Sequence, residues 1–371
     1  MAQLPPFRLL MCMVLLFAIC GPASAINFSQ TGGPYELIGK ASNVNFIANY
    51  GNLLYAATDN GVWSWDGSSW SQLGGIFGLT GYAAIVTQVV RGDGPLYAST
   101  AGSGVWSWDG SSWSQVGGPQ GLPIMSSSVN CLLISNRVLY AGTWNGVWVW
   151  DGTSWSLLDT GNGVAQGPKT LYHITCLASN NGTLYAGTTE GVWAWNGSSW
   201  TQLGGSDGLV SDAQIIQDMI FINGTLYVGT SNDGVFSWNG ISWNKLGNPN
   251  QLTGNAISIS GLLNSPGMLY AGTLNGLWEF NWSTWGWSQV SEFNSNPTFV
   301  TSLAIDSHNT FYVGTHGEGV WSTTVPSGSS PQTTIENGGV ARPTKSSLSP
   351  LLTFASLVVT IFLLGWVKLK K

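Results

Sequence analysis

One string of residues recurs seven times along the chain, and this repetition constrains the fold more than any other feature. Each copy reads Leu-Tyr-Ala-Gly-Thr or a close variant, and successive copies lie 42 to 45 residues apart. Gly-Val-Trp-x-Trp follows within a few residues, and then an Asp-Gly or Asn-Gly turn leads to a Trp-Ser-Gln-Leu-Gly-like string. The seven tyrosines are Tyr55, Tyr97, Tyr140, Tyr185, Tyr227, Tyr270 and Tyr312.

Each repeat contains four short apolar runs separated by Gly, Asn, Asp and Ser, which supply turn geometry. An Asp-Gly or Asn-Gly pair between two tryptophan-bearing runs is a strong hairpin signal. Four antiparallel strands in about 42 residues are typical of one propeller blade. The sequence therefore predicts an all-β fold, a seven-bladed β-propeller with four-stranded blades. Because one blade cannot bury both of its faces, we expect most tryptophans to pack between neighbouring blades.

The seventh repeat stops early. It has an inner run from Val300 to Ile305 and a Gly319-Val-Trp string, but no outer run. At the start of the body, Tyr35-Glu-Leu-Ile-Gly39 stands alone and matches Trp-Ser-Gln-Leu-Gly. We predict that this N-terminal strand closes the last blade, because closure would remove an exposed sheet edge.

The string Leu-Tyr-Ala-Gly-Thr-x-x-Gly-Val-Trp-x-Trp-Asp-Gly resembles the repeat of the two-component-regulator type propellers over about residues 33 to 325. The resemblance implies a periplasmic sensor or ligand-binding module. The chain departs from that family because only Lys368 to Lys371 follow its last apolar run. Direct kinase signalling is therefore not expected.

The two ends of the chain predict export and anchoring. Residues 1–25 have the pattern of a secretory signal peptide: Arg8, an apolar run, and small residues at Ala23 and Ala25. The propeller body then spans 26–325, and a Ser/Pro/Thr/Gly-rich linker spans 326–350. Residues 351–371 predict a short transmembrane helix with a basic tail. We therefore expect a C-terminally anchored protein on the cell surface or the extracytoplasmic face of a membrane.

A lipid-anchor signal is the rival interpretation of the C-terminal segment. Asn337-Gly338-Gly339 are small residues, and a polar spacer and an apolar tail follow them. The charged end of the chain weakens that interpretation. Both alternatives place the same body outside the membrane.

Composition excludes several classes of partner and chemistry. Only 8% of the residues are charged, and residues 26–325 contain five basic side chains against sixteen acidic ones. A nucleic-acid partner is therefore not expected. No ligand spacing for zinc or calcium and no nucleophile motif occurs, so we expect neither a metal nor a cofactor. Cys131 and Cys176, at equivalent places in two repeats, are more simply two buried apolar side chains than a disulfide bridge.

Blade topology sorts the loops onto two faces. The tight turns after the first and third strands of each blade share one face, and we expect it to point towards the membrane, because the last strand ends there. The four asparagines that are candidate glycosylation sites also lie in those turns. They are Asn181, Asn196, Asn223 and Asn281.

The irregular loops share the opposite face, and we expect a protein or glycan ligand to bind there, because loops on a rigid scaffold usually carry binding sites. Trp144 is the sharpest candidate, since no other repeat has an aromatic residue at its position. The candidate ligand-binding residues are Trp144, Phe77, Tyr82, Tyr172, His173, Glu190, Asp233, His316 and Glu318.

Two alternatives to a binding module remain open. Glu190, Asp233 and Glu318 could act as paired carboxylates of a glycosidase or lyase at the channel mouth. The protein could also be a structural component of a surface coat. The sequence favours the non-enzymatic binding module.

Overall fold

The computed structural model describes residues 28–32, 36–75, 78–118, 121–123, 126–158, 171–204, 208–209, 213–248, 251–265, 267–290 and 299–324. The predicted signal peptide, linker and C-terminal apolar segment lie outside these ranges. Within them, no helix has the length and apolar character needed to cross a bilayer.

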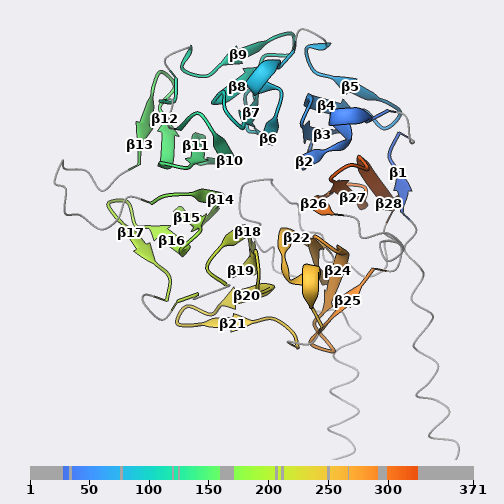
Figure 1. Ribbon diagram of the computed structural model, residues 1–371. Coiled ribbons are helices and arrows are strands. Elements are labelled where there is room, and N and C mark those ends of the chain that lie inside the picture. Colours follow the sequence, from blue (N-terminus) through green and yellow to red (C-terminus); the bar gives the residue numbers. More distant parts are fainter. Residues whose placement is uncertain are drawn as a thin grey trace, which may run out of the picture.

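Seven four-stranded antiparallel sheets form a ring (Figure 1). In this architecture the blades surround a central channel. The chain is therefore a seven-bladed β-propeller, as the repeats predict. Six blades are built from consecutive strands. The seventh combines three strands from the end of the body with one from its start.

The first three blades run as follows. Blade 1 is β2 (Val44–Tyr50), β3 (Leu53–Thr58), β4 (Gly61–Trp65) and β5 (Trp70–Gln72). Blade 2 is β6 (Val86–Arg91), β7 (Leu96–Thr100), β8 (Val105–Trp108) and β9 (Trp113–Gln115). Blade 3 is β10 (Val129–Ser135), β11 (Val138–Thr143), β12 (Gly146–Trp150) and β13 (Trp155–Leu157).

The other four blades repeat the same order. Blade 4 is β14 (Ile174–Asn180), β15 (Thr183–Thr188), β16 (Gly191–Trp195) and β17 (Trp200–Gln202). Blade 5 is β18 (Ile216–Ile222), β19 (Thr225–Thr230), β20 (Val235–Trp238) and β21 (Trp243–Lys245). Blade 6 is β22 (Ile259–Ser265), β23 (Met268–Thr273), β24 (Gly276–Asn281) and β25 (Gly286–Gln289). Blade 7 is β26 (Val300–Ile305), β27 (Thr310–Thr315), β28 (Val320–Thr324) and β1 (Ser29–Gln30).

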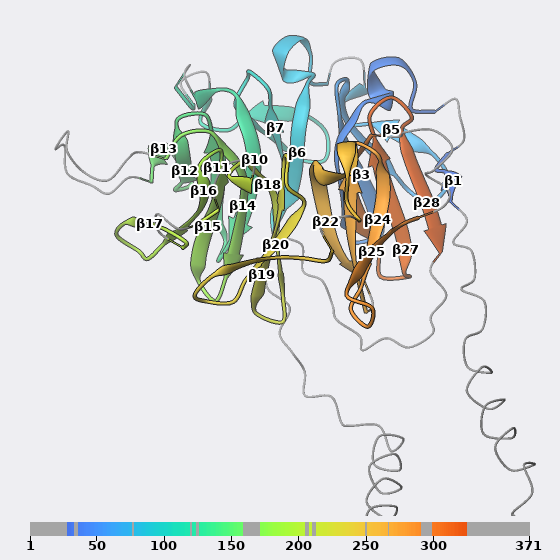
Figure 2. The same ribbon diagram turned by 60° about the horizontal axis from the view of Figure 1, so that its bottom comes forward.

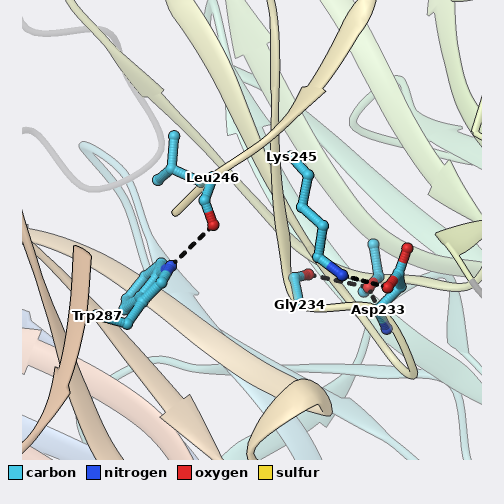
Figure 3. Close-up of polar contacts among 6 residues, drawn as sticks. Asp233, Gly234, Lys245, Leu246 and Trp287 are labelled. Atoms are coloured by element: carbon cyan, nitrogen blue, oxygen red, sulfur yellow. Dashed lines mark hydrogen bonds and ion pairs between the residues drawn. The ribbon is translucent and has the colours of Figure 1, made fainter. Parts of the chain in front are cut away.

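The outermost strands join neighbouring blades through tryptophan. In six blades a tryptophan at the first or second position of the outermost strand donates a hydrogen bond from its indole Nε1 to a main-chain carbonyl of the preceding blade. For Trp287 the acceptor is Leu246, at 3.1 Å (Figure 3). The six donors, at 3.1 to 3.3 Å, are Trp70, Trp113, Trp155, Trp200, Trp243 and Trp287. The recurrent tryptophans therefore pack between blades, as expected.

An N-terminal strand closes blade 7, but the predicted residues are wrong. The closing strand is β1, in which Ser29 pairs with Ser322 and Gln30 with Trp321 of β28. Phe28-Ser-Gln-Thr-Gly32 is the true counterpart of Trp70-Ser-Gln-Leu-Gly74, with Phe in place of Trp. The described part of the predicted segment, Glu36 to Gly39, instead leads through η2 (Gly39–Ser42) into β2.

The strand directions place the loops on two faces. The irregular-loop face carries the segments before each inner strand and the loops between second and third strands. The segments before the inner strands include η4 (Gly81–Ala83) and η9 (Gly254–Ile257). In Figure 2 this face is at the top, where the cyan η4 stands out. The turn face carries the tight turns after the first and third strands and is at the bottom of that view. Cys131 and Cys176 are free and buried, as expected.

Candidate functional site at the channel mouth

The mouth of the channel on the irregular-loop face is built from two residues of each blade. One precedes the inner strand and the other follows the second strand. Main-chain hydrogen bonds tie such residues together, for example His316 N to Phe299 O and His173 N to Trp144 O, both at 2.9 Å. Because regular strands hold both positions, the side chains at the mouth have a rigid support.

Just inside the mouth, the second residue of every inner strand is polar and uncharged. Five of these side chains donate hydrogen bonds to the carbonyl of the first inner-strand residue in the next blade, as Thr87 does to Val129 at 2.7 Å. The same bond is made by Asn45, Asn130, Ser260 and Thr301. Thr175 and Gln217 complete the set of seven. The channel wall at this depth is therefore polar and carries no charge.

Trp144 and His173 meet at the mouth although they come from different blades. Trp144 follows β11 of blade 3, and His173 precedes β14 of blade 4. Their ring centroids are 3.9 Å apart. His173 holds a φ of +52°, a left-handed conformation that non-glycine residues adopt rarely. This backbone conformation accompanies a tilted contact, with ring planes 49° apart, between the imidazole and an indole that remains 53% exposed.

A second aromatic–imidazole pair lies across the channel. Phe299 precedes β26, and His316 follows β27, so blade 7 supplies both. Their rings stack with centroids 5.7 Å apart and planes 21° from parallel. Blade 7 faces blades 3 and 4 across the ring (Figure 1). The two pairs therefore flank the mouth on opposite sides.

The carboxylate at the mouth is engaged by amides. Asp59 accepts a hydrogen bond from Asn43 Nδ2 at 2.9 Å and another from Asn45 Nδ2 at 3.0 Å. Both of its oxygens are used, so Asp59 holds the rim of blade 1 together. These hydrogen bonds orient the two asparagine amides, so the carboxylate has a structural role.

The irregular-loop face also collects exposed apolar side chains. Six of the eight large hydrophobic residues that are exposed in the described part of the chain lie there. They are Ile38, Tyr82, Ile85, Trp144, Tyr172 and Leu274. Tyr82 and Tyr172, two of the predicted candidates, are 82% and 57% exposed. Phe77 lies outside the described residues.

The three predicted carboxylates are not gathered at the mouth. Asp233 forms an ion pair with Lys245 on β21, the outermost strand of its own blade (Figure 3). The main-chain oxygens of Glu190 and Glu318 accept hydrogen bonds from Gln202 of β17 and Gln30 of β1, which are also outermost strands. Each carboxylate-bearing residue therefore stands at the outer side of a different blade.

The turn face is dominated by side chains that cap their own turns. Asp109 Oδ1 accepts main-chain hydrogen bonds from Ser111 and Ser112, and these bonds hold the pKa of its carboxyl well below the usual range. Asp66 and Asp151 repeat the arrangement. The candidate glycosylation residues lie on this face: Asn181 and Asn223 have φ of +49° and +50°, and Asn196 and Asn281 occupy the outer turns.

Sequence reasoning missed several residues of the mouth. Phe299, Ile85, Leu274 and Asn43 each precede an inner strand or follow a second strand. An alignment of the seven repeats at those two positions would have found them. Among the described residues, no cluster of three or more His, Cys, Asp or Glu side chains is placed to hold a metal ion.

No family model matches the chain, and no curated protein matches it. Solved structures with the same fold are numerous. The extracellular domain of BT4673 from B. thetaiotaomicron, described as a hybrid two component system, has a TM-score of 0.62 at 17% identity and covers 80% of this chain and 40% of its own. PorZ, a surface component of the type-IX secretion system of Porphyromonas gingivalis, has a TM-score of 0.59 at 17% identity and covers 78% and 47%.

YCF48, solved bound to D1 peptide, has a TM-score of 0.58 at 14% identity and covers 81% of this chain and 96% of its own. The chain thus spans less than half the length of the BT4673 and PorZ chains that it matches. At these identities the likeness establishes the fold. The chain is a seven-bladed β-propeller with the fold of the extracellular propeller domains of two-component systems.

Proposed function

We propose that this protein is a non-enzymatic, extracytoplasmic interaction module that binds a partner protein through its irregular-loop face. The observation that carries the proposal is the gathering of six exposed apolar side chains on that face, around a mouth bearing Trp144 and His173. Exposed apolar groups concentrated on one face mark interaction sites. The extracellular or surface location of the BT4673 and PorZ structures supports an extracytoplasmic place for this chain.

A protein partner fits the face better than a glycan does. The exposed residues include the aliphatic Ile38, Ile85 and Leu274, and they are spread over several blades. A broad contact with aromatic anchors and an uncharged centre is typical of protein interfaces. A glycan that stacks on Trp144 is the second class of ligand, and the experiment below distinguishes it.

The test uses two tryptophans of nearly equal exposure on opposite faces. Trp144 is 53% exposed on the irregular-loop face, and Trp285 is 56% exposed on the turn face. The full chain is used to capture partners from an envelope extract of its source and to probe a glycan array, and affinity for each captured ligand is then measured. Trp144→Ala should weaken binding about 30-fold, the effect of losing a central hot-spot side chain. Trp285→Ala should leave the affinity unchanged.

The outcomes separate the possibilities. A captured protein whose binding depends on Trp144 supports the proposal. A glycan that depends on Trp144 keeps the face but changes the class of ligand. Equal affinities of both variants and the intact chain for every ligand would contradict the assignment of the face. Turnover of a glycan that is lost in Glu190→Gln or Asp233→Asn would show an enzyme instead.

A further inference from the structure

The turn face divides into an acidic part and an uncharged part. Five described turns of blades 4, 5 and 6, at 181–182, 196–199, 223–224, 239–242 and 282–285, contain no charged residue. We call these turns the uncharged sector. The turns of the other four blades carry Asp66, Asp93, Asp109, Arg137, Asp151, Asp306 and His308. The sector spans three adjacent blades of the ring (Figure 1).

Ile241 is the most exposed large apolar side chain among the described residues, at 86%. Its counterparts in blades 1 to 4 are Ser68, Ser111, Thr153 and Ser198, whose hydroxyls donate to the Asp or Asn that begins the turn. Isoleucine gives up that hydrogen bond and places a branched apolar group in solvent. A residue that departs from the repeat pattern and gains no stabilising contact within the fold indicates a contact with a partner.

Trp285 is the second anomaly of the sector. It is more than half exposed, and its φ of +52° is in the left-handed region, which is unfavourable for a bulky side chain. The edge-on contact of its ring with Phe280, with centroids 5.4 Å apart, holds the indole in place. The backbone is therefore strained at the residue that presents an indole on the surface.

The chain continues from the turn face towards the predicted membrane segment. β28 ends at Thr324 on the turn face, in the blade next to blade 6. Residues 326–350 are rich in Ser, Pro, Thr and Gly, a composition for which a segment of this length would have a root-mean-square span of about 28 Å, and the apolar run that begins at Leu351 follows it. Such a tether keeps the turn face at high effective concentration beside a bilayer.

We propose that the uncharged sector docks on the surface of the lipid bilayer, with Ile241 and Trp285 lying among the headgroups. Tryptophan favours this region, where its ring is in an apolar layer and its N–H remains hydrated. The acidic turns of blades 1 to 3 stay in water, so the ring is tilted on the membrane. The proposal goes beyond the interaction module, because it concerns the opposite face and leaves the irregular-loop face pointing outward.

The experiment compares equivalent turn positions in two blades. Full chains carrying Ile241→Cys or Ser111→Cys are labelled with a fluorophore and reconstituted into phosphatidylcholine vesicles. Cys131 and Cys176 do not interfere, because burial raises the pKa of both thiols and keeps them unreactive. The other two cysteines belong to the predicted signal peptide. Quenching by iodide in water should fall severalfold for the label at 241 and stay unchanged for the label at 111.

Two further arms complete the test. Adding Trp285→Ser to the chain labelled at 241 should restore quenching, and raising the salt concentration should not, since the contact is uncharged. Equal quenching at 241 and 111 in vesicles, or failure of the chain to float with vesicles, overturns the proposal. Glycans on Asn181, Asn196, Asn223 or Asn281 of the protein from its source overturn it too, because all four lie in or beside the same sector. None of these results bears on binding at the irregular-loop face.

Discussion

Neighbouring blades contact one another at their outermost strands and again beside the channel, and we call these contacts the outer and inner joints. The two kinds of joint differ in how far their residues repeat from blade to blade. At the outer joints one residue type, tryptophan, donates to a carbonyl of the preceding blade in six of seven cases. At the inner joints, the third residue of the inner strand differs between nearly all of the blades. These residues are Phe46, Gln88, Cys131, Cys176, Asp218, Gly261 and Ser302. The periphery therefore specifies the repeat, while the joints beside the channel vary.

The seventh outer joint tests this comparison most severely, because a separate piece of chain completes it. Deleting residues 28–32 should abolish cooperative thermal unfolding, since blade 7 would lose β1 and Trp70 would lose its acceptor, the carbonyl of Thr31. The loss would also leave a sheet edge unpaired. Calorimetry measures the effect, and a truncated chain that still unfolds sharply near the temperature of the intact chain would contradict it.

The inner joints should differ from the outer ones in their response to pH. Asp218 is partly buried, and its two oxygens accept main-chain hydrogen bonds from Met219 and from Leu262 of the next blade at 2.8 and 2.7 Å. Burial raises the pKa of its carboxyl to about 6. The folded state therefore holds this proton more tightly than the unfolded chain, where the pKa is about 3.9.

The stabilisation from Asp218 is accordingly complete below pH 4 and is lost as the pH rises through 6. The free energy of unfolding should fall by up to about 3 kcal/mol from this group across that window. Asp218→Asn should remove this slope, which denaturant titrations at several pH values will detect. The turn carboxylates Asp66, Asp109 and Asp151 have lowered pKa values, so their effects lie below pH 4. An unchanged slope in the variant would refute the assignment.

A smaller effect should come from a single outer joint. Trp287→Phe removes the indole N–H that bonds to the carbonyl of Leu246 and should lower the free energy of unfolding by about 1–2 kcal/mol. Phe28 occupies the equivalent place in blade 7, so Phe28→Trp should lower the free energy of unfolding by less than Trp287→Phe does. Trp144→Phe, on the exposed mouth, is the matched control and should leave stability unchanged. Equal losses for Trp287→Phe and Trp144→Phe would show that the joint adds nothing.

The contrast between the joints also explains what could be predicted from the sequence. The tryptophan strings repeat because every outer joint needs the same donor, so the seven blades could be counted directly. The closing strand was misplaced because it begins with Phe28, where the other copies have tryptophan. Residues Tyr35 to Gly39 matched the outer-strand pattern instead. At the mouth, Trp144 stood out by its type. His173 was also a candidate, but its contact with Trp144 was not predicted, because that contact depends on a left-handed residue and joins two different blades.

The smallest expected effect on stability concerns Ile241, an exposed residue that departs from the repeat pattern. Ile241→Ser restores the repeat residue, whose hydroxyl donates to the first residue of the turn in blades 1 to 4. The free energy of unfolding should rise by less than about 1 kcal/mol, because one exposed hydrogen bond is gained and no buried contact is lost. Denaturant titration in the absence of vesicles measures this change. A clear loss of stability would show that Ile241 belongs to the fold, and its exposure would then need no external partner.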